Sequence, residues 1–269
     1  MTFYHEIILG SALAGSIAVA VYRLGWFTGA GAAAGGALGA FVVLAGGWAW
    51  ALPLGVFAVS GSLLSRLPEP AGTTEGAATA PRTVYQVLAN GGVASVALMA
   101  ALYTDTALAG TALAGTALAY AVFAGAVATA TADTWATEIG TRYGGHGRAW
   151  SLATGQWTEA GASGAVTGIG TAAGALGAGV VGGLGVAFGM LGPGAALWVL
   201  LSGVLGSLVD SGLGAWAQAQ YTHPGSTRLY DAAAAPNDAP TRGWRRLTNS
   251  GVNALATLSG GAIAGLPFV

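Results

Sequence analysis

Eight apolar stretches, each about as long as a membrane-spanning helix, account for most of this chain. A spanning helix needs roughly 20 apolar residues. Only 7% of the 269 residues are charged, against about 25% in soluble proteins. The sequence therefore predicts an all-α, polytopic membrane helical bundle, a single domain over residues 1–269. We expect about eight transmembrane helices, at about 5–22, 26–45, 47–64, 84–103, 107–130, 161–190, 195–219 and 249–267.

The basic residues predict the side of the membrane on which each connection lies. All nine are arginines, and every one falls in the connections after the first, third, fifth and seventh spans. Arginine-rich connections stay cytoplasmic, so we expect both termini to be external and the host membrane to be the cell membrane. Three of these connections are long, at about 65–83, 131–160 and 220–248. We expect them to form the face that carries the functional site.

Composition excludes several classes of function. The net charge of −1 gives no long-range field that would attract nucleic acid. The absence of cysteine excludes thiolate chemistry, disulfides and sulfur-ligated metals. Oxygen and nitrogen side chains must therefore carry any chemistry.

Carboxylates inside the apolar stretches are the first candidates, because burying a charge in hydrocarbon costs several kcal/mol. Asp210 lies about 15 residues into the seventh span, which is roughly 22 Å along a core about 30 Å thick. Asp133 and Glu138 lie at the cytoplasmic end of the fifth span. Carboxylate oxygens from two helices suit Mg²⁺, which keeps waters and binds substrate phosphates. We predict that Asp133, Glu138 and Asp210 are catalytic and bind Mg²⁺.

Polar side chains at the starts of the fourth and eighth spans form a second group. Arg82, Gln86 and Asn90 are spaced by four and therefore stack on one helical face. Asn249 and Asn253 repeat this spacing at a similar depth. An arginine followed by two amides suits a phosphate and a polar head group that enter from the cytoplasm. We predict that all five bind substrate; for the first three, a structural role in interhelical hydrogen bonds is the alternative.

Four stretches resemble the membrane-protein family that includes the phytyl-phosphate kinase of chloroplast vitamin E salvage. They are Arg82-x-x-x-Gln86-Val-Leu-Ala-Asn90-Gly-Gly, Asp133-Thr-Trp-Ala-Thr-Glu-Ile-Gly140, Gly206-Ser-Leu-Val-Asp210-Ser-x-Leu-Gly214-Ala and Thr248-Asn249-x-Gly-Val-Asn253. The match covers most of residues 60–267. The chain departs from the family pattern at Gly161-Ala-Ser163-Gly164, where Gly-Thr-Asn/Asp-Gly usually opens a span. It also has Asn249-Ser250-Gly251 where Asn-Asp-Gly is usual.

This resemblance implies a CTP-dependent, Mg²⁺-assisted kinase that converts a prenyl monophosphate, such as phytyl or geranylgeranyl phosphate, into the diphosphate. The reaction would take place at the cytoplasmic membrane face. Arg82, with Arg142 or Arg148, would neutralise charge on the transferred phosphoryl group. The expected partners are the prenyl monophosphate, the nucleotide and the lipid bilayer; a homo-oligomer stays open.

A secondary transporter or ion-coupled carrier is the alternative, since buried acids and broken helices fit that class as well. Transport sites lie near the midplane of the membrane and need polar residues on paths from both sides. The outer half of the predicted bundle is almost free of ionisable groups. This asymmetry favours chemistry at one face.

Overall fold

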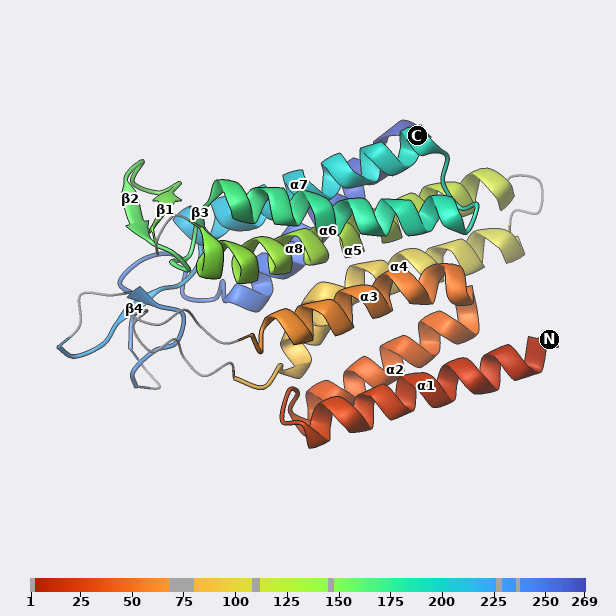
Figure 1. Ribbon diagram of the computed structural model, residues 1–269, viewed down its shortest axis with the longest axis horizontal. Coiled ribbons are helices and arrows are strands. Elements are labelled where there is room, and N and C mark those ends of the chain that lie inside the picture. Colours follow the sequence, from red (N-terminus) through yellow and green to blue (C-terminus); the bar gives the residue numbers. More distant parts are fainter. Residues whose placement is uncertain (1–2, 68–79, 108–111, 145–147, 226–228, 236–237) are drawn as a thin grey trace.

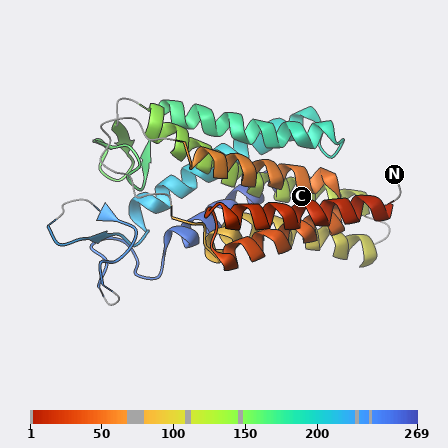
Figure 2. The same ribbon diagram turned by 60° about the horizontal axis from the view of Figure 1, so that its bottom comes forward.

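Eight helices correspond to the eight apolar stretches. The structure is a computed structural model that describes residues 3–67, 80–107, 112–144, 148–225, 229–235 and 238–269. Within these residues the helices run nearly along one axis and form an all-α bundle (Figures 1 and 2). They are α1 (Phe3–Arg23), α2 (Gly29–Gly46), α3 (Trp48–Leu64), α4 (Val84–Ala107), α5 (Ala112–Tyr143), α6 (Gly168–Ala187), α7 (Pro193–Trp216) and α8 (Asn249–Gly265).

Six of these helices are long and apolar enough to cross a membrane, namely α2, α4, α5, α6, α7 and α8. The apolar parts of the other two, Ile8–Arg23 and Trp48–Leu64, are shorter. The prediction of a polytopic helical bundle is therefore confirmed. The loop segments 68–79 and 145–147, and Arg228 with the two residues before it, lie outside the described residues.

Two predicted boundaries are wrong. The fifth span was expected to end at residue 130, but α5 continues to Tyr143. The sixth was expected to begin at residue 161, but α6 begins at Gly168 after the Thr167 cap, whose hydroxyl accepts a hydrogen bond from the Gly170 amide at 3.0 Å. The segment 131–160 is therefore half helix rather than a loop.

Short strands follow α5 and α7 at the arginine-rich end of the bundle. β1 (Arg148–Ser151) pairs antiparallel with β2 (Trp157–Glu159) and with β3 (Ala165–Val166), in the order β2-β1-β3. β4 (Tyr221–Thr222) pairs with β5 (Leu229–Tyr230). Both chain termini lie at the opposite end (Figure 1). The predicted arrangement, in which the long connections share one end and the termini the other, is therefore present.

Helix α5 forms the centre of the bundle, because α3, α4, α6, α7 and α8 all pack against it. The residues along its middle, such as Phe123 and Val127, are fully buried. Glycines allow the close approach of the neighbouring helices. A Cβ atom at Gly174 of α6 would lie 2.8 Å from the carbonyl oxygen of Ala132, and one at Gly170 would lie 2.6 Å from that of Ala136. The polar end of α5 is therefore held tightly between its neighbours.

Candidate active site at the arginine-rich end

A pocket of about 600 Å³ lies at the arginine-rich end of the bundle. Its walls come from the C-terminal ends of α3, α5 and α7 and from the first turns of α4, α6 and α8. The loop between β2 and β3, together with β3 itself, closes one side. Eight of the predicted site residues line this single pocket: Arg82, Gln86, Asn90, Asp133, Glu138, Asp210, Asn249 and Asn253.

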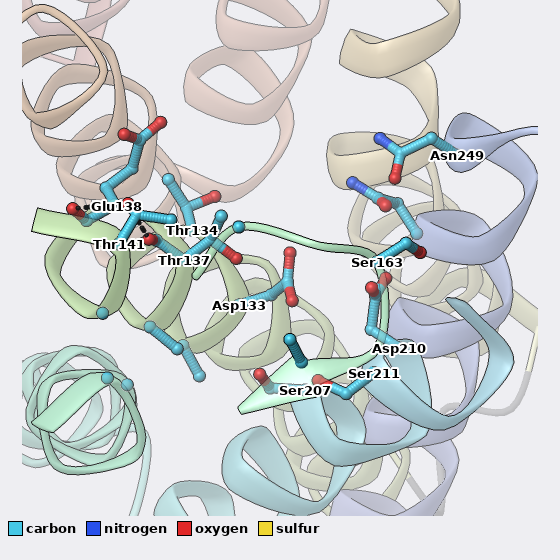
Figure 3. A pocket seen from close by; sticks show the side chains of 18 of the residues that line it. Asp133, Thr134, Thr137, Glu138, Thr141, Ser163, Ser207, Asp210, Ser211 and Asn249 are labelled. Carbon is cyan, nitrogen blue, oxygen red and sulfur yellow. Dashed lines mark hydrogen bonds between the residues drawn. The ribbon is translucent and has the colours of Figure 1, made fainter. Parts of the chain in front are cut away.

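Two carboxylates on different helices face the same space. Asp133 extends from α5 and Asp210 from α7, toward the middle of the pocket (Figure 3). Their negative charges act on one another. The Ser207 hydroxyl, one turn before Asp210 on α7, lies near Asp133 in the same pocket. Such paired carboxylates repel each other unless a cation or a proton lies between them.

A chain of amides holds Asp210 from the other side. With its nitrogen turned toward the carboxylate, the side chain of Asn253 donates to Oδ2 of Asp210 at 3.1 Å and to the backbone oxygen of Asn249 at 2.9 Å. This orientation is required because a carboxylate only accepts hydrogen bonds. The other end of the Asn253 amide lies 3.2 Å from the Asn90 side chain. Asn90 and Asn253 thus connect α4, α8 and α7, which matches the interhelical role considered for Asn90.

Glu138 has a different set of partners. Its Oε2 lies 2.5 Å from Nη1 of Arg142, one turn later on α5, and its Oε1 accepts a hydrogen bond from the Ser65 hydroxyl at 2.6 Å. Nη2 of Arg142 donates to the carbonyl oxygen of Leu67 at 3.0 Å. These bonds tie the end of α3 to α5 and turn Glu138 away from Asp133 (Figure 3).

The predicted set of three metal-binding carboxylates is therefore not brought together. In the part of the chain that the structure describes, no three His, Cys, Asp or Glu side chains gather closely enough to hold a metal ion. The physical reason is that Glu138 satisfies its charge locally, at the i,i+4 spacing that favours ion pairs. Asp133 and Asp210 remain as the pair of hard oxygen donors. Mg²⁺ commonly binds one or two carboxylates together with substrate phosphates, so this donor set fits it.

Arg82 lines the pocket at the start of α4. Its guanidinium lies 5.9 Å from the ring centroids of both Phe27 and Phe57. Burial lowers the pKa of this guanidinium from its usual value, while the negative charge of Glu138 raises it. Arginine stays charged in proteins, so Arg82 presents a partly buried positive charge to the pocket.

Gln86 lines the pocket but also caps its own helix. Its Oε1 accepts a hydrogen bond from the backbone N–H of Thr83 at 2.9 Å. The Thr83 hydroxyl in turn accepts one from the backbone N–H of Gln86 at 3.4 Å. This reciprocal pair is a capping box, and the spacing Thr-x-x-Gln is its sequence signature. The side-chain oxygen of Gln86 is therefore occupied, which leaves its nitrogen for the pocket.

The family pattern led us to expect that the segment Gly161-Ala-Ser163-Gly164 opens a span. It instead forms the loop before β3. Ser163 lies beside Asp210 and Asn249 (Figure 3). Gly164 has φ +76°, and a Cβ atom there would lie 2.5 Å from Cα of Ala215 on α7. The loop therefore rests directly on α7, and the serine occupies the pocket position where the family usually has an amide or acid.

Two predicted arginines lie outside the pocket wall. Arg142 is engaged by Glu138, and Arg148 lies on β1, with its guanidinium 5.8 Å from the ring centroid of Trp157. The pocket also contains residues that we did not predict: Ser65, Arg66, Thr134, Thr137, Thr141, Ser163, Thr167, Thr171, Ser207, Ser211 and Asp231. The spacing of Thr134, Thr137 and Thr141 along one face of α5 was a readable signal. Asp231 follows β5 in an irregular connection and carries no such signal.

A bundle of apolar helices with a polar pocket at one end defines an integral membrane protein. A family model confirms this class: residues 12–261 match the family described as integral membrane protein DUF92, and the chain belongs to that family. Comparison with curated proteins gave no match, and comparison with solved structures gave none either.

Proposed function

We propose that this protein is a CTP-dependent phosphotransferase that converts a prenyl monophosphate into the diphosphate at the cytoplasmic face of the cell membrane. A phosphate oxygen of the acceptor attacks the γ-phosphorus of the nucleotide. The bond between that phosphorus and the β,γ-bridging oxygen breaks, and CDP leaves with the bridging oxygen. The family contains members of the phytyl-phosphate kinase type, which supports this class of reaction.

The observation that carries the proposal is the pair of carboxylates, Asp133 and Asp210, that face one pocket from two helices. These two residues would hold Mg²⁺, and the bound cation would supply positive charge to the transferred group. Asn253 holds Asp210 by a hydrogen bond, and the Ser207 hydroxyl lies near Asp133. Asp210 is therefore oriented before any ligand binds, which is what a site that works by positioning requires.

The remaining polar groups suit two anionic substrates. Arg82 and Arg66 supply positive charge at the pocket wall. The acceptor is already an anion, so no strong general base is needed, and the chain must instead bring two negatively charged groups together. The nucleotide has an aqueous entrance, because Asn249 and Asp231 are both pocket residues and solvent-exposed.

The test is an assay of purified protein with labelled nucleotides, Mg²⁺ and a panel of prenyl phosphates and prenyl alcohols. We expect transfer of the γ-phosphoryl group from CTP to a prenyl monophosphate. Asp133→Asn and Asp210→Asn should each lower turnover by about 1000-fold or more in a folded protein, because each removes a carboxylate from the cation site. The matched control is Glu159→Gln, an exposed acid on β2 outside the pocket, which should keep full turnover.

Full turnover in either aspartate variant would contradict the role assigned to this pair. Uptake of a solute by sealed vesicles without nucleotide, together with no transfer to any acceptor, would favour a transporter instead.

A further inference from the structure

Apolar side chains also line the polar pocket. They include Val166 of β3 and Val204 and Leu208 of α7, and the small residues Gly170 and Gly174 of α6 line it as well. The rest of the wall is made mainly of hydroxyl, amide and charged side chains. An acceptor that carries a phosphate and a long hydrocarbon tail needs both kinds of surface.

Two of the pocket-lining residues, one on α7 and one on α6, also carry exposed surface. Leu208 lines the pocket and is nevertheless 40% exposed. Thr171 of α6 also lines the pocket and is exposed. A pocket-lining residue with exposed surface is where a pocket can open, and the opening that we infer lies here, sideways between these two helices.

The opening lies within the apolar length of the bundle. Leu208 precedes the end of α7, at Trp216, by eight residues, which is about 12 Å along the helix axis. Leu201 and Leu205 continue the same exposed stripe toward the middle of α7 at 43% and 46% exposure. A helix face of exposed leucines in a membrane bundle faces lipid. The opening therefore faces hydrocarbon rather than water.

We infer that the opening between Thr171 and Leu208 is the passage through which the isoprenoid tail of the acceptor extends from the pocket into the lipid. This inference rests on the proposed function. It assigns the acceptor phosphate to the polar part of the pocket, where Arg82 and Arg66 supply positive charge, and the tail to a lateral path, while the nucleotide uses the aqueous entrance near Asn249 and Asp231. Keeping the tail in lipid avoids exposing it to water, which would cost about 0.8 kcal/mol per methylene group.

A bulky side chain at the opening should hinder long tails only. We expect Leu208→Trp to raise KM for geranylgeranyl phosphate by about 10-fold or more, because the new ring fills the passage. KM for CTP and turnover of the short acceptor dimethylallyl phosphate should not change. The matched control is Leu205→Trp, which places the same ring on the same lipid-facing stripe but outside the pocket wall. If Leu208→Trp does not fold, Thr171→Trp fills the opening from the other side.

A binding measurement separates this inference from the proposed function. Geranylgeranyl phosphate with a photoreactive diazirine in the first isoprene unit of its tail should label the α6 and α7 residues beside the opening, whether or not turnover occurs. Labelling there without phosphoryl transfer to any acceptor would overturn the proposed function and support the passage. Transfer with equal KM values in the Leu208→Trp and Leu205→Trp variants, or labelling only at other helices, would overturn the passage.

Discussion

The side-chain nitrogen of Asn253 lies 3.1 Å from Oδ2 of Asp210 and joins α8 to the acidic residue of α7. The same amide contacts Asn90 at 3.2 Å, so three helices meet at one hydrogen-bonded chain. A second bond supports the contact between α8 and α4, since the Thr257 hydroxyl donates to the carbonyl oxygen of Ala89 at 3.0 Å. Asn253 therefore orients a carboxylate, whatever else it contacts in the pocket.

Replacement of Asn253 by alanine should weaken the use of Mg²⁺. Loss of a partner that orients a metal-binding carboxylate typically costs 10- to 100-fold in metal affinity or activity. We expect the Mg²⁺ concentration that gives half-maximal phosphoryl transfer to rise by about this factor. Ser259→Ala, at a half-buried position later on α8 where the hydroxyl donates to the carbonyl of Leu255 on the same helix, is the control. An unchanged Mg²⁺ requirement in Asn253→Ala would argue against the orienting role.

Much of this site was predictable because depth in a membrane can be read from the sequence. Five of the site residues lie at the same end of their apolar stretches: Arg82, Asn90, Asp133, Asp210 and Asn253. The bundle has to bring such ends together. The helices themselves follow from apolar length alone. Hydropathy and position along the chain are enough for both predictions, and the structure places all five residues in one pocket.

The pairing of the polar groups was not predictable in the same way. Glu138 could have turned to Asp133 or to Arg142, and the Ser65 hydroxyl at the end of α3 adds to the i,i+4 spacing in favouring the second. The end of α5 was misplaced for a related reason. Hydropathy falls after residue 130, but α6 packs closely against the turns of α5 that follow, where Gly170 and Gly174 lie next to the carbonyls of Ala136 and Ala132. The helix therefore continues where its hydrophobicity does not.

Glu138→Gln should destabilise the protein more than it changes the Mg²⁺ requirement. The Arg142 side chain is only 6% exposed, and loss of its charged partner leaves an unpaired cation in a buried position. Removal of one partner of a buried pair costs about 3–5 kcal/mol. We expect a lower unfolding temperature in detergent and an unchanged half-maximal Mg²⁺ concentration.

The double variant Glu138→Gln with Arg142→Gln tests the pairing directly. It should recover part of the lost stability, because neither side chain then carries an unpaired charge. A large rise in the Mg²⁺ requirement of Glu138→Gln without loss of stability would instead show that Glu138 belongs to the cation site.

Gly164→Ala should lower activity by displacing Ser163. The alanine would adopt φ +76°, which is unfavourable for an L-residue, and its Cβ would press against Ala215 of α7. The loop must then lift from α7, and its serine moves away from Asp210. Gly155→Ala is the matched control, since Gly155 has φ +61° but its added Cβ would meet only the Trp150 ring, at 3.9 Å. Both variants carry the same backbone strain, so equal activity would show that the contact with α7 has no role in catalysis.

A side chain in place of the hydrogen of Gly260 should destabilise the contact between α5 and α8. A Cβ atom there would collide with the hydroxyl of Thr129, and the Thr129 hydroxyl already donates to the carbonyl of Gly125 at 2.9 Å. Overpacking of this kind costs about 1–3 kcal/mol, so Gly260→Ala should lower the unfolding temperature in detergent. In a Thr129→Ala background the colliding oxygen is gone, and the same substitution should cost clearly less. Gly183→Ala, on an open face of α6, should leave the unfolding temperature unchanged or slightly raised. Equal penalties for Gly260→Ala in the two backgrounds would mean that Thr129 does not set the distance between these helices.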